Sequence, residues 1–221
     1  MSELWLIRHG QSISNAGLPT GHPSRSALTD LGHQQAVYVA KALKAAPDRL
    51  IVSPYFRAMD TAKPLRDRFP DMPVTVAAVQ EFTYLDLESY QGATREMRRP
   101  QIQDYWARCD PLHRQGEGAE TFAELVLRVE DFFCRYVEGP DVPPGLTVVC
   151  THGQFIRAAY LRFFGGIGGE FAADPRAMAR FRGFREAFAV PNGAIARLSV
   201  GPQPRLGAFD VSHLPPRMVT Y

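Results

Sequence analysis

Cysteine is scarce in this chain, with three residues among 221. The three, Cys109, Cys134 and Cys150, are odd in number and not clustered, which fits neither a disulfide framework nor a zinc site. Cys150 falls within an apolar run, so we expect it to be a small core residue. A reducing compartment is therefore predicted, and the cytoplasm is the simplest one.

Long hydrophobic runs and excess charge are absent as well. No stretch reaches the roughly 18 consecutive apolar residues that a transmembrane helix needs. The first residues, Met1-Ser2-Glu3, lead directly into a strand pattern, without the basic segment and apolar stretch of a secretory signal. The formal net charge is +2, which is too small to argue for nucleic acid or an anionic membrane surface as a partner.

Neither a low-complexity tract nor a block of charge divides the chain into two halves. Hydrophobic residues make up 45% of the sequence and charged residues 22%, a composition typical of globular proteins. A chain of 221 residues is long enough to bury one substantial core. We therefore expect a single domain over residues 1–221.

Short apolar runs alternate with segments of helical periodicity. The expected helices run from the N-cap Thr29 to Pro47, from Ser53-Pro54 in the first turn to about Phe69, and over residues 121–137 and 155–164. The expected strands cover residues 4–7, 49–52, 74–79, 146–151 and 194–200, the last at an edge of the sheet. This alternation predicts an α/β fold with a largely parallel sheet.

The segment from residue 81 to about residue 120 interrupts the alternation. It is rich in proline and glycine, and irregular segments of this length inside a domain are often lids or binding loops. We expect a lid that contains one or two helices. Within it, Arg95, Arg98 and Arg99 could bind a second anionic group of a substrate or form a solvated helix face.

Polar side chains follow four of the expected strands. Arg8-His9-Gly10 follows the first strand, Arg57 falls in the helical turn after the second, Glu81 follows the third, and His152-Gly153 follows the fourth. Ligands bind at the carboxyl ends of parallel strands, so these groups are expected to converge. A neutral imidazole can attack phosphorus, and the arginine fork matches phosphate oxygens. Because a cation near a helix N-terminus is unfavourable alone, Arg57 fits better with an anionic partner.

Taken together and in order, these motifs resemble the histidine phosphatase superfamily, also called phosphoglycerate mutase-like. The matching stretches cover nearly the whole chain: residues 6–12 with Asn15, residues 28–32 with 35–36, Ser53-Pro54 with Arg57-Ala58 and Thr61-Ala62, Glu81, residues 118–121 with Arg128-Val129, residues 151–153 and residues 192–195. The resemblance implies a three-layer α/β/α sandwich with a mostly parallel sheet.

The resemblance also implies roles for individual residues. His9 is the expected nucleophile, which becomes phosphohistidine, and Glu81 is the expected proton donor to the leaving group. Arg8, Arg57 and His152 are expected to hold the phosphoryl oxygens. The expected substrate-binding residues are Gly10, Gln11, Asn15 and Gly153. The family needs no metal, and no metal or cofactor is expected here.

Elementary electrostatics adds two expectations for the site. Two neighbouring arginines should lower the pKa of His9 and keep its ring unprotonated for attack. The other ring nitrogen should donate to a backbone carbonyl that fixes the tautomer. We expect Glu81 to become a competent acid mainly in the substrate complex.

The expected function is hydrolysis of a phosphate monoester on a small phosphorylated substrate, with a possible homo-oligomer and with neither nucleic acid nor membrane as partner. The chain lacks the Glu-Arg-His-Tyr-Gly stretch of cofactor-dependent phosphoglycerate mutases, which favours hydrolysis over a mutase. Three alternatives stay open: phosphoryl transfer of the mutase type, a phosphoprotein phosphatase with an open site, and a non-catalytic protein that binds a phosphorylated ligand.

Overall fold

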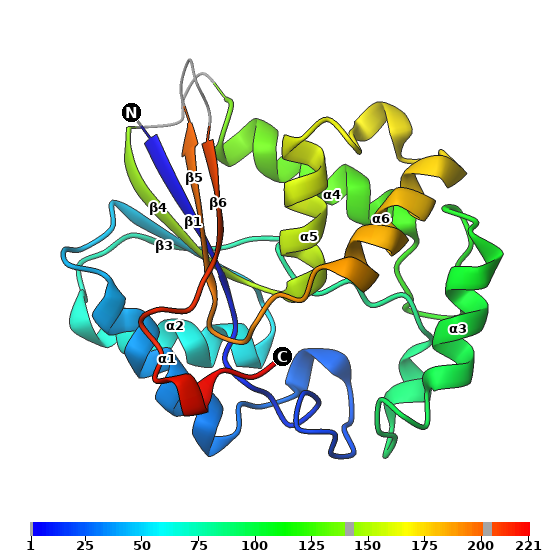
Figure 1. Cartoon of the computed structure of the whole chain (residues 1–221), viewed down its shortest axis with the longest axis horizontal. Coiled ribbons are helices and arrows are strands. Elements are labelled where there is room, and N and C mark those ends of the chain that lie inside the picture. Colours follow the sequence, from blue (N-terminus) through cyan, green and yellow to red (C-terminus); the bar gives the residue numbers. More distant parts are fainter. Residues whose placement is uncertain (1, 140–143, 201–204) are drawn as a thin grey trace.

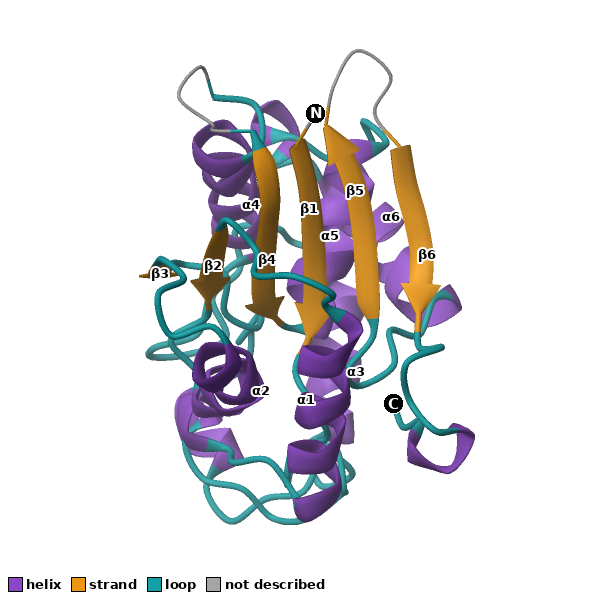
Figure 2. Ribbon diagram, turned by 90° about the vertical axis from the view of Figure 1, so that its left-hand side faces the viewer, coloured by secondary structure: helices purple, strands orange, loops and turns teal. Residues whose placement is uncertain are grey.

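A six-stranded sheet lies at the centre of the structure, a computed structural model that describes residues 2–139, 144–200 and 205–221. The strand order is β3-β2-β4-β1-β5-β6 (Figure 2). The strands are β1 (Ser2–Arg8), β2 (Arg49–Val52), β3 (Val74–Val76), β4 (Gly145–Thr151), β5 (Ile195–Val200) and β6 (Arg205–Asp210). Only β5 runs antiparallel to its neighbours, so the prediction of a mostly parallel sheet is confirmed.

Helices cover both faces of the sheet, which confirms the expected three-layer sandwich. One face carries α1 (Asp30–Ala42) and α2 (Phe56–Arg68), and the other carries α4 (Phe122–Tyr136), α5 (Gly153–Phe163) and α6 (Pro175–Ala187) (Figure 2). The remaining α-helix of the described chain, α3 (Arg99–Arg108), stands away from the sheet (Figure 1).

Two apolar cores separate the three layers. Because successive side chains of a strand point to opposite faces, Leu6 joins the core under α4 and α5, whereas Ile7 joins the core under α1 and α2. Cys150 is buried in the second core, as predicted from its apolar run. The capping box between Thr121 and Glu124 begins α4, whose buried side contributes seven residues to the first core.

Several boundaries differ from the predicted ones. The helix predicted to begin at Ser53-Pro54 starts at Phe56, because Ser53 Oγ accepts the N–H of Tyr55 and holds the preceding residues in a turn. The first helix ends at Ala42 instead of Pro47. The third strand stops at Val76, where the Val79 N–H turns back to the Ala77 carbonyl at 2.7 Å.

The edge of the sheet was also predicted wrongly. β5 lies between β1 and β6, so β6 closes that edge. β6 has mostly exposed or half-buried residues with little period-two contrast, which is why its pattern is weak in the sequence.

The segment over residues 81–120 holds a short 3-10 helix (Leu87–Tyr90) and α3. Buried aromatic rings attach it to the main body: Phe82 lies 6.4 Å from Phe122 of α4 between ring centroids, and Trp106 stacks on Phe181 of α6 at 5.8 Å. The segment therefore packs on the first core through its apolar side, while its polar side is left to border the region beyond the strand ends.

Candidate functional site

His9 follows β1 directly and is held through its backbone from both sides. Its N–H donates to the Thr151 carbonyl of β4 at 3.0 Å, and its carbonyl accepts from Gly193 N at 3.2 Å and from Asn192 Nδ2 at 3.3 Å. These bonds reach His9 from β4 and from the turn that precedes β5, and these two strands flank β1. The position of the imidazole is therefore set by the sheet as well as by a surface loop.

Glycine is required where the chain leaves β1. A Cβ atom on Gly10 would overlap the carbonyl oxygen of Gly32 in the first turn of α1, and a Cβ atom on Gly32 would overlap the carbonyl of Gln11. The Gly10 N–H donates to Thr61 Oγ1 on α2 at 3.0 Å. The loop after His9 is thus clamped between the first two helices by direct backbone approach.

Both ring nitrogens of His9 are engaged. Nδ1 lies 2.6 Å from the Gly10 carbonyl oxygen, and Nε2 lies 3.0 Å from Arg57 Nε. Because a guanidinium only donates, Nε2 must be the acceptor and Nδ1 must carry the proton. Burial, followed by the charges of Arg57 and Arg8, lowers the pKa of His9 well below its ordinary value. The predicted tautomer bond is present, and burial outweighs the arginines as the cause of the neutral state.

Arg57 is the second residue of α2 and is buried against His9. Nη1 donates to the Pro23 carbonyl at 2.7 Å, and the guanidinium lies over the ring of Tyr55 at 5.1 Å. No carboxylate forms an ion pair with it within residues 2–139, 144–200 and 205–221. Burial, partly offset by the charge of Glu81, lowers the pKa of Arg57.

His152 follows β4 as the N-cap of α5 and lies beside His9, with a distance of 5.0 Å between ring centroids. Its Nε2 is 2.7 Å from Ser53 Oγ at the end of β2, and the residue is fully buried. Burial and then the charge of Arg57 lower the pKa of His152 well below its ordinary value. Nδ1 has no hydrogen-bond partner in the described part of the chain, so one ring nitrogen is uncommitted.

Glu81 lies beyond β3 and is held at the start of α5. Its Oε1 accepts the N–H of Phe82 at 3.1 Å and the N–H of Gln154 at 3.0 Å. The carboxylate therefore takes one of the free N–H groups of the first turn of α5, whose N-cap His152 supplies no side-chain bond. Its second oxygen, Oε2, has no partner among the residues that the structure describes.

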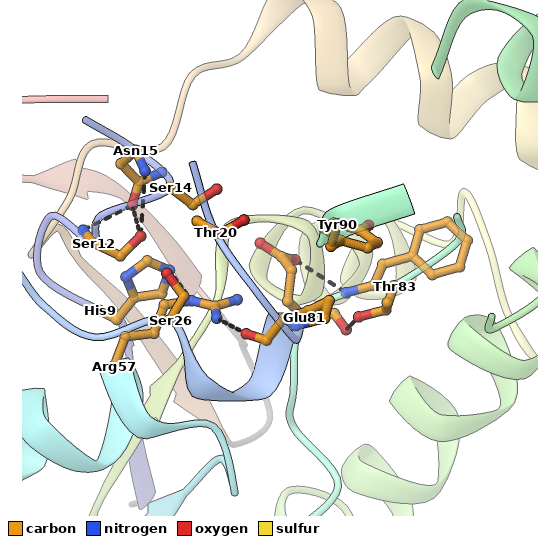
Figure 3. Close-up of a pocket in the computed structure, with 12 residues that line it drawn as sticks. His9, Ser12, Ser14, Asn15, Thr20, Ser26, Arg57, Glu81, Thr83 and Tyr90 are labelled. Carbon is orange, nitrogen blue, oxygen red and sulfur yellow. Dashed lines mark hydrogen bonds between the residues drawn. The ribbon is translucent and has the colours of Figure 1, made fainter. Parts of the chain in front are cut away.

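A cavity of about 130 Å³ lies between His9, Arg57 and Glu81, and we call it the His9 cavity; His152 is not among its lining residues. Figure 3 shows His9, Arg57, Glu81 and Asn15 around it, with Tyr90 on the far side. Pro23 and Phe82 form the apolar part of the wall, and the rest is neutral and polar: Ser12, Ser14, Thr20, Ser26 and Thr83. One fixed cation, a neutral imidazole and several hydroxyl donors around a small space are the groups that a tetrahedral oxyanion needs.

The other predicted residues are placed differently. Arg8 and Gly153 line a larger adjoining cavity, whose wall also includes Asn15 and Glu81. Burial, partly offset by Glu81, lowers the pKa of Arg8 to about 10. Gln11 instead turns toward α1, where Thr29 Oγ1 donates to its Oε1 at 2.8 Å. Its role in substrate binding, like that of Gly10, stays a prediction.

Two residues that support the site received no role from the sequence. Asn192 Nδ2 donates to the His9 carbonyl and to Asn15 Oδ1 at 3.2 Å, and Gln35 Oε1 accepts the Gln11 N–H at 2.7 Å. Asn192 precedes a glycine and looks like an ordinary turn residue, whereas Gln35 looks like a polar position of a surface helix. Their complete burial is the signal that distinguishes them, and it is visible only in the fold.

No group of three or more histidine, cysteine, aspartate or glutamate side chains in the described ranges is arranged to hold a metal ion. No described helix combines the length and the apolar character needed to cross a membrane.

Residues 4–178 match the family model described as histidine phosphatase superfamily (branch 1). One curated relative is an adenosylcobalamin/alpha-ribazole phosphatase from Salmonella typhi, 31% identical over 138 residues, which are 60% of this chain and 65% of that protein. Another is a 2,3-bisphosphoglycerate-dependent phosphoglycerate mutase from Methylocella silvestris, 32% identical over 163 residues, 70% of this chain and 78% of that protein. The match therefore spans slightly less than two thirds of the Salmonella protein.

Solved structures share the fold over most of both chains. A phosphoserine phosphatase from Entamoeba histolytica, in complex with 3-phosphoglyceric acid, superposes with a TM-score of 0.70 at 21% identity, covering 97% of this chain and 100% of that one. A mycobacterial glucosyl-3-phosphoglycerate phosphatase with bound VO3 has a TM-score of 0.68 at 24% identity, covering 95% and 99%. These likenesses establish the architecture, and the family match establishes the kinship that the motifs predicted.

Proposed function

Because this chain belongs to branch 1 of the histidine phosphatase superfamily, we propose that it hydrolyses phosphate monoesters in two steps through a phosphohistidine on His9. The observation that carries the proposal is the state of the imidazole. Nδ1 donates to the Gly10 carbonyl, and Nε2, which carries the lone pair, lies at the cavity beside Arg57. Burial keeps the ring neutral, as a nucleophile must be.

In the first step, the Nε2 lone pair forms a bond to phosphorus while the bond to the ester oxygen breaks. Before substrate binds, the Arg57 Nε–H group donates a hydrogen bond to His9 Nε2. When substrate binds, this N–H group donates to a phosphoryl oxygen instead, and the Nε2 lone pair becomes free to attack. Asn15, which lines the His9 cavity, and His152, whose ring lies beside that of His9 with an unpartnered Nδ1, would hold further oxygens. Arg8 would contribute from the wall that the larger cavity shares with this site.

The leaving oxygen takes the electron pair of the broken bond and a proton from Glu81. In the second step, water attacks phosphorus, gives its proton to Glu81, and returns the P–N electron pair to His9. The unengaged Oε2 of Glu81, facing the same cavity as His9, supports this role. The sum is an ester and water converted to an alcohol and phosphate.

The substrate is proposed to be a small phosphorylated molecule, since the His9 cavity accommodates little more than a phosphoryl group. The three cysteines are unpaired, which supports a reducing compartment such as the cytoplasm. Assembly into a homo-oligomer stays a prediction.

Phosphoryl transfer of the mutase type is the second candidate, since some relatives carry a mutase name. A mutase and a phosphatase share the first step and differ in whether water or a second hydroxyl receives the phosphoryl group. Free phosphate release and isomer formation, measured on the same phosphoglycerate sample, separate the two.

Trapping the phosphorylated protein tests the mechanism directly. Acid-labile, base-stable phosphate should appear on His9 during turnover and be absent from the His9→Ala variant, which should be inactive. Glu81→Gln should slow esters with poor leaving groups by about 10²- to 10⁴-fold, while a good leaving group such as p-nitrophenolate needs no proton in the first step. A fully active His9→Ala protein, or a Glu81→Gln variant with normal rates on alkyl phosphates, would overturn the assignments.

A further inference from the structure

The larger cavity, which adjoins the His9 cavity, has a volume of about 470 Å³. The two share Asn15, Glu81, Phe82 and Tyr90, so a ligand with its phosphoryl group at His9 extends from one into the other. The lining of the larger cavity includes residues of the segment before α3, of α5 and of α6. Five arginines line it, and we call it the arginine cavity: Arg8, Arg95, Arg98, Arg157 and Arg185.

Two of these cations meet at Gly153. The position of a Cβ atom on Gly153 would be 3.1 Å from Arg157 Nη1 and 3.5 Å from Arg8 Nε. The absent side chain of Gly153 thus leaves a small space bordered by two guanidinium groups, one of them buried. Two guanidinium charges that border the same small space repel each other, and an anion bound between or beside them would relieve this repulsion.

The protein itself supplies little negative charge to this cavity. Its side-chain carboxylates are Glu81, which is bound to two backbone N–H groups, and Glu186, which pairs with Arg182 at 3.1 Å. Across residues 2–139, 144–200 and 205–221, neither Arg8 nor Arg157 nor Arg185 forms an ion pair.

The same guanidinium groups are already oriented by other contacts. Arg157 Nε donates to the Phe188 carbonyl at 2.8 Å, and Arg185 stacks on the Trp106 ring at 5.0 Å. Arg8 is anchored through Nη1 on the Val190 carbonyl, while its buried Nε has no partner in the described structure. Burial lowers the pKa of Arg157; the charge of Glu81 partly offsets this effect, and the charges of Arg185 and Arg95 add to it. Anchored cations with unused N–H groups are preorganised to bind an oxyanion.

We propose that the arginine cavity binds a second anionic group of the substrate, a carboxylate or a second phosphate, and that Arg157 is its principal ligand. The inference rests on the proposed function, since it places the first anionic group at His9. Arg8, on the shared side, would contact both groups, and Arg185 would complete the site from α6. The preferred substrates are therefore phosphate esters of acids or bisphosphates.

Matched pairs of esters test this directly. 3-Phosphoglycerate and glycerol 3-phosphate differ by a carboxylate in place of a hydroxymethyl group. 1,3-Propanediol bisphosphate and 3-hydroxypropyl phosphate differ by a second phosphate. The wild-type kcat/KM should favour the more anionic member of at least one pair by about 10- to 100-fold, the size expected of charge-assisted hydrogen bonds. The pair that shows the preference identifies the anion.

Variants assign the preference to the cavity. Arg157→Met should bring the ratio within a pair close to one, mainly through KM, whereas Arg157→Lys, which keeps the charge, should retain part of it. Arg66→Met, the same change at an exposed arginine of α2 outside both cavities, should leave the ratio and the basal rate unchanged. If Arg157→Met fails to fold, Arg185→Met provides the test on its own.

A binding measurement keeps this result separate from catalysis. Calorimetric Kd values for each pair, measured on the His9→Ala protein, should show the same preference without turnover. Equal rates and equal Kd values within both pairs would overturn the second-anion site while leaving the phosphatase proposal standing. A Kd preference without any hydrolysis by the wild type would support the site and overturn the proposed function.

Discussion

Replacing Arg57 separates its two roles at the site, which are to donate hydrogen bonds to the phosphoryl group and to lower the pKa of His9. The guanidinium has five N–H donors, and the structure commits two of them, one to His9 Nε2 and one to the Pro23 carbonyl. The remaining donors are free to meet phosphoryl oxygens in the His9 cavity. Loss of one preorganised donor to a developing anion costs about 3 to 4 kcal/mol, so Arg57→Met should lower kcat by about 10²- to 10³-fold.

The pH profile of the same variant reports the second action. The charge of Arg57 is one cause of the lowered pKa of His9, but burial is the larger cause and remains in Arg57→Met. The acid limb of kcat/KM should therefore move to higher pH and still lie below about pH 6.5, the value of an unperturbed histidine. Arg57→Lys, which keeps a cation but loses the fork, should hold the acid limb in place and still lose rate.

The assay is hydrolysis of p-nitrophenyl phosphate between about pH 4.5 and pH 8, with circular dichroism to confirm folding of each variant. Stability should change little, because the hydrogen bond lost to Pro23 is offset by removal of a buried cation without a carboxylate partner. A folded Arg57→Met protein with kcat within about threefold of wild type, or an acid limb that does not move, would refute this reasoning.

Three further predictions concern stability and positioning. His9 and His152 are both held neutral by burial, so their folded pKa values lie below the unfolded value. The stability that they contribute is present above about pH 6.5 and is lost on acidification, at about 1.4 kcal/mol per pH unit for each histidine. In denaturant titrations at decreasing pH, the free energy of unfolding of His152→Gln should therefore fall less steeply than that of the wild type. Asn192→Ala should lower the free energy of unfolding by about 1 to 3 kcal/mol and reduce kcat more than it raises KM, because the His9 carbonyl and Asn15 each lose a buried donor. Gly32→Ala should destabilise despite the higher helix propensity of alanine, because its Cβ would overlap the Gln11 carbonyl. Gly183→Ala on α6, where nothing lies within 4 Å of the new Cβ, should instead stabilise by about 1 kcal/mol, and thermal melts of the pair check both. Equal melting shifts for the two glycine variants would contradict the overlap.

The positions of His9 and His152 were predictable because each follows a buried strand directly. An apolar run reveals the strand, and parallel strands end at one edge of a sheet, so two residues far apart in sequence are brought together by a simple rule. The helix that contains Arg57 was predictable because it follows the second buried strand, although the predicted helix began at Ser53-Pro54 and α2 begins at Phe56.

What the sequence could not reveal is where long side chains turn after their backbone position is set. Arg8 and His9 are adjacent, yet Arg8 lines the larger cavity while His9 lines the smaller one. Gln11 resembles a ligand-binding residue but bonds to α1. These directions depend on partners such as the Val190 carbonyl and Thr29, which lie elsewhere in the chain and have no local signature.

The place of β4 in the sheet has a consequence for folding. β4 is inserted between β1 and β2, although it follows both of them by a long stretch of chain. Pairings of such high contact order form slowly, because the loop must close before the contacts compensate for its entropy. Only after this insertion does His152 lie beside His9 and does the His9 N–H donate to the Thr151 carbonyl. Recovery of activity during refolding is therefore a reporter of the completed sheet, and it should lag behind recovery of helical circular dichroism.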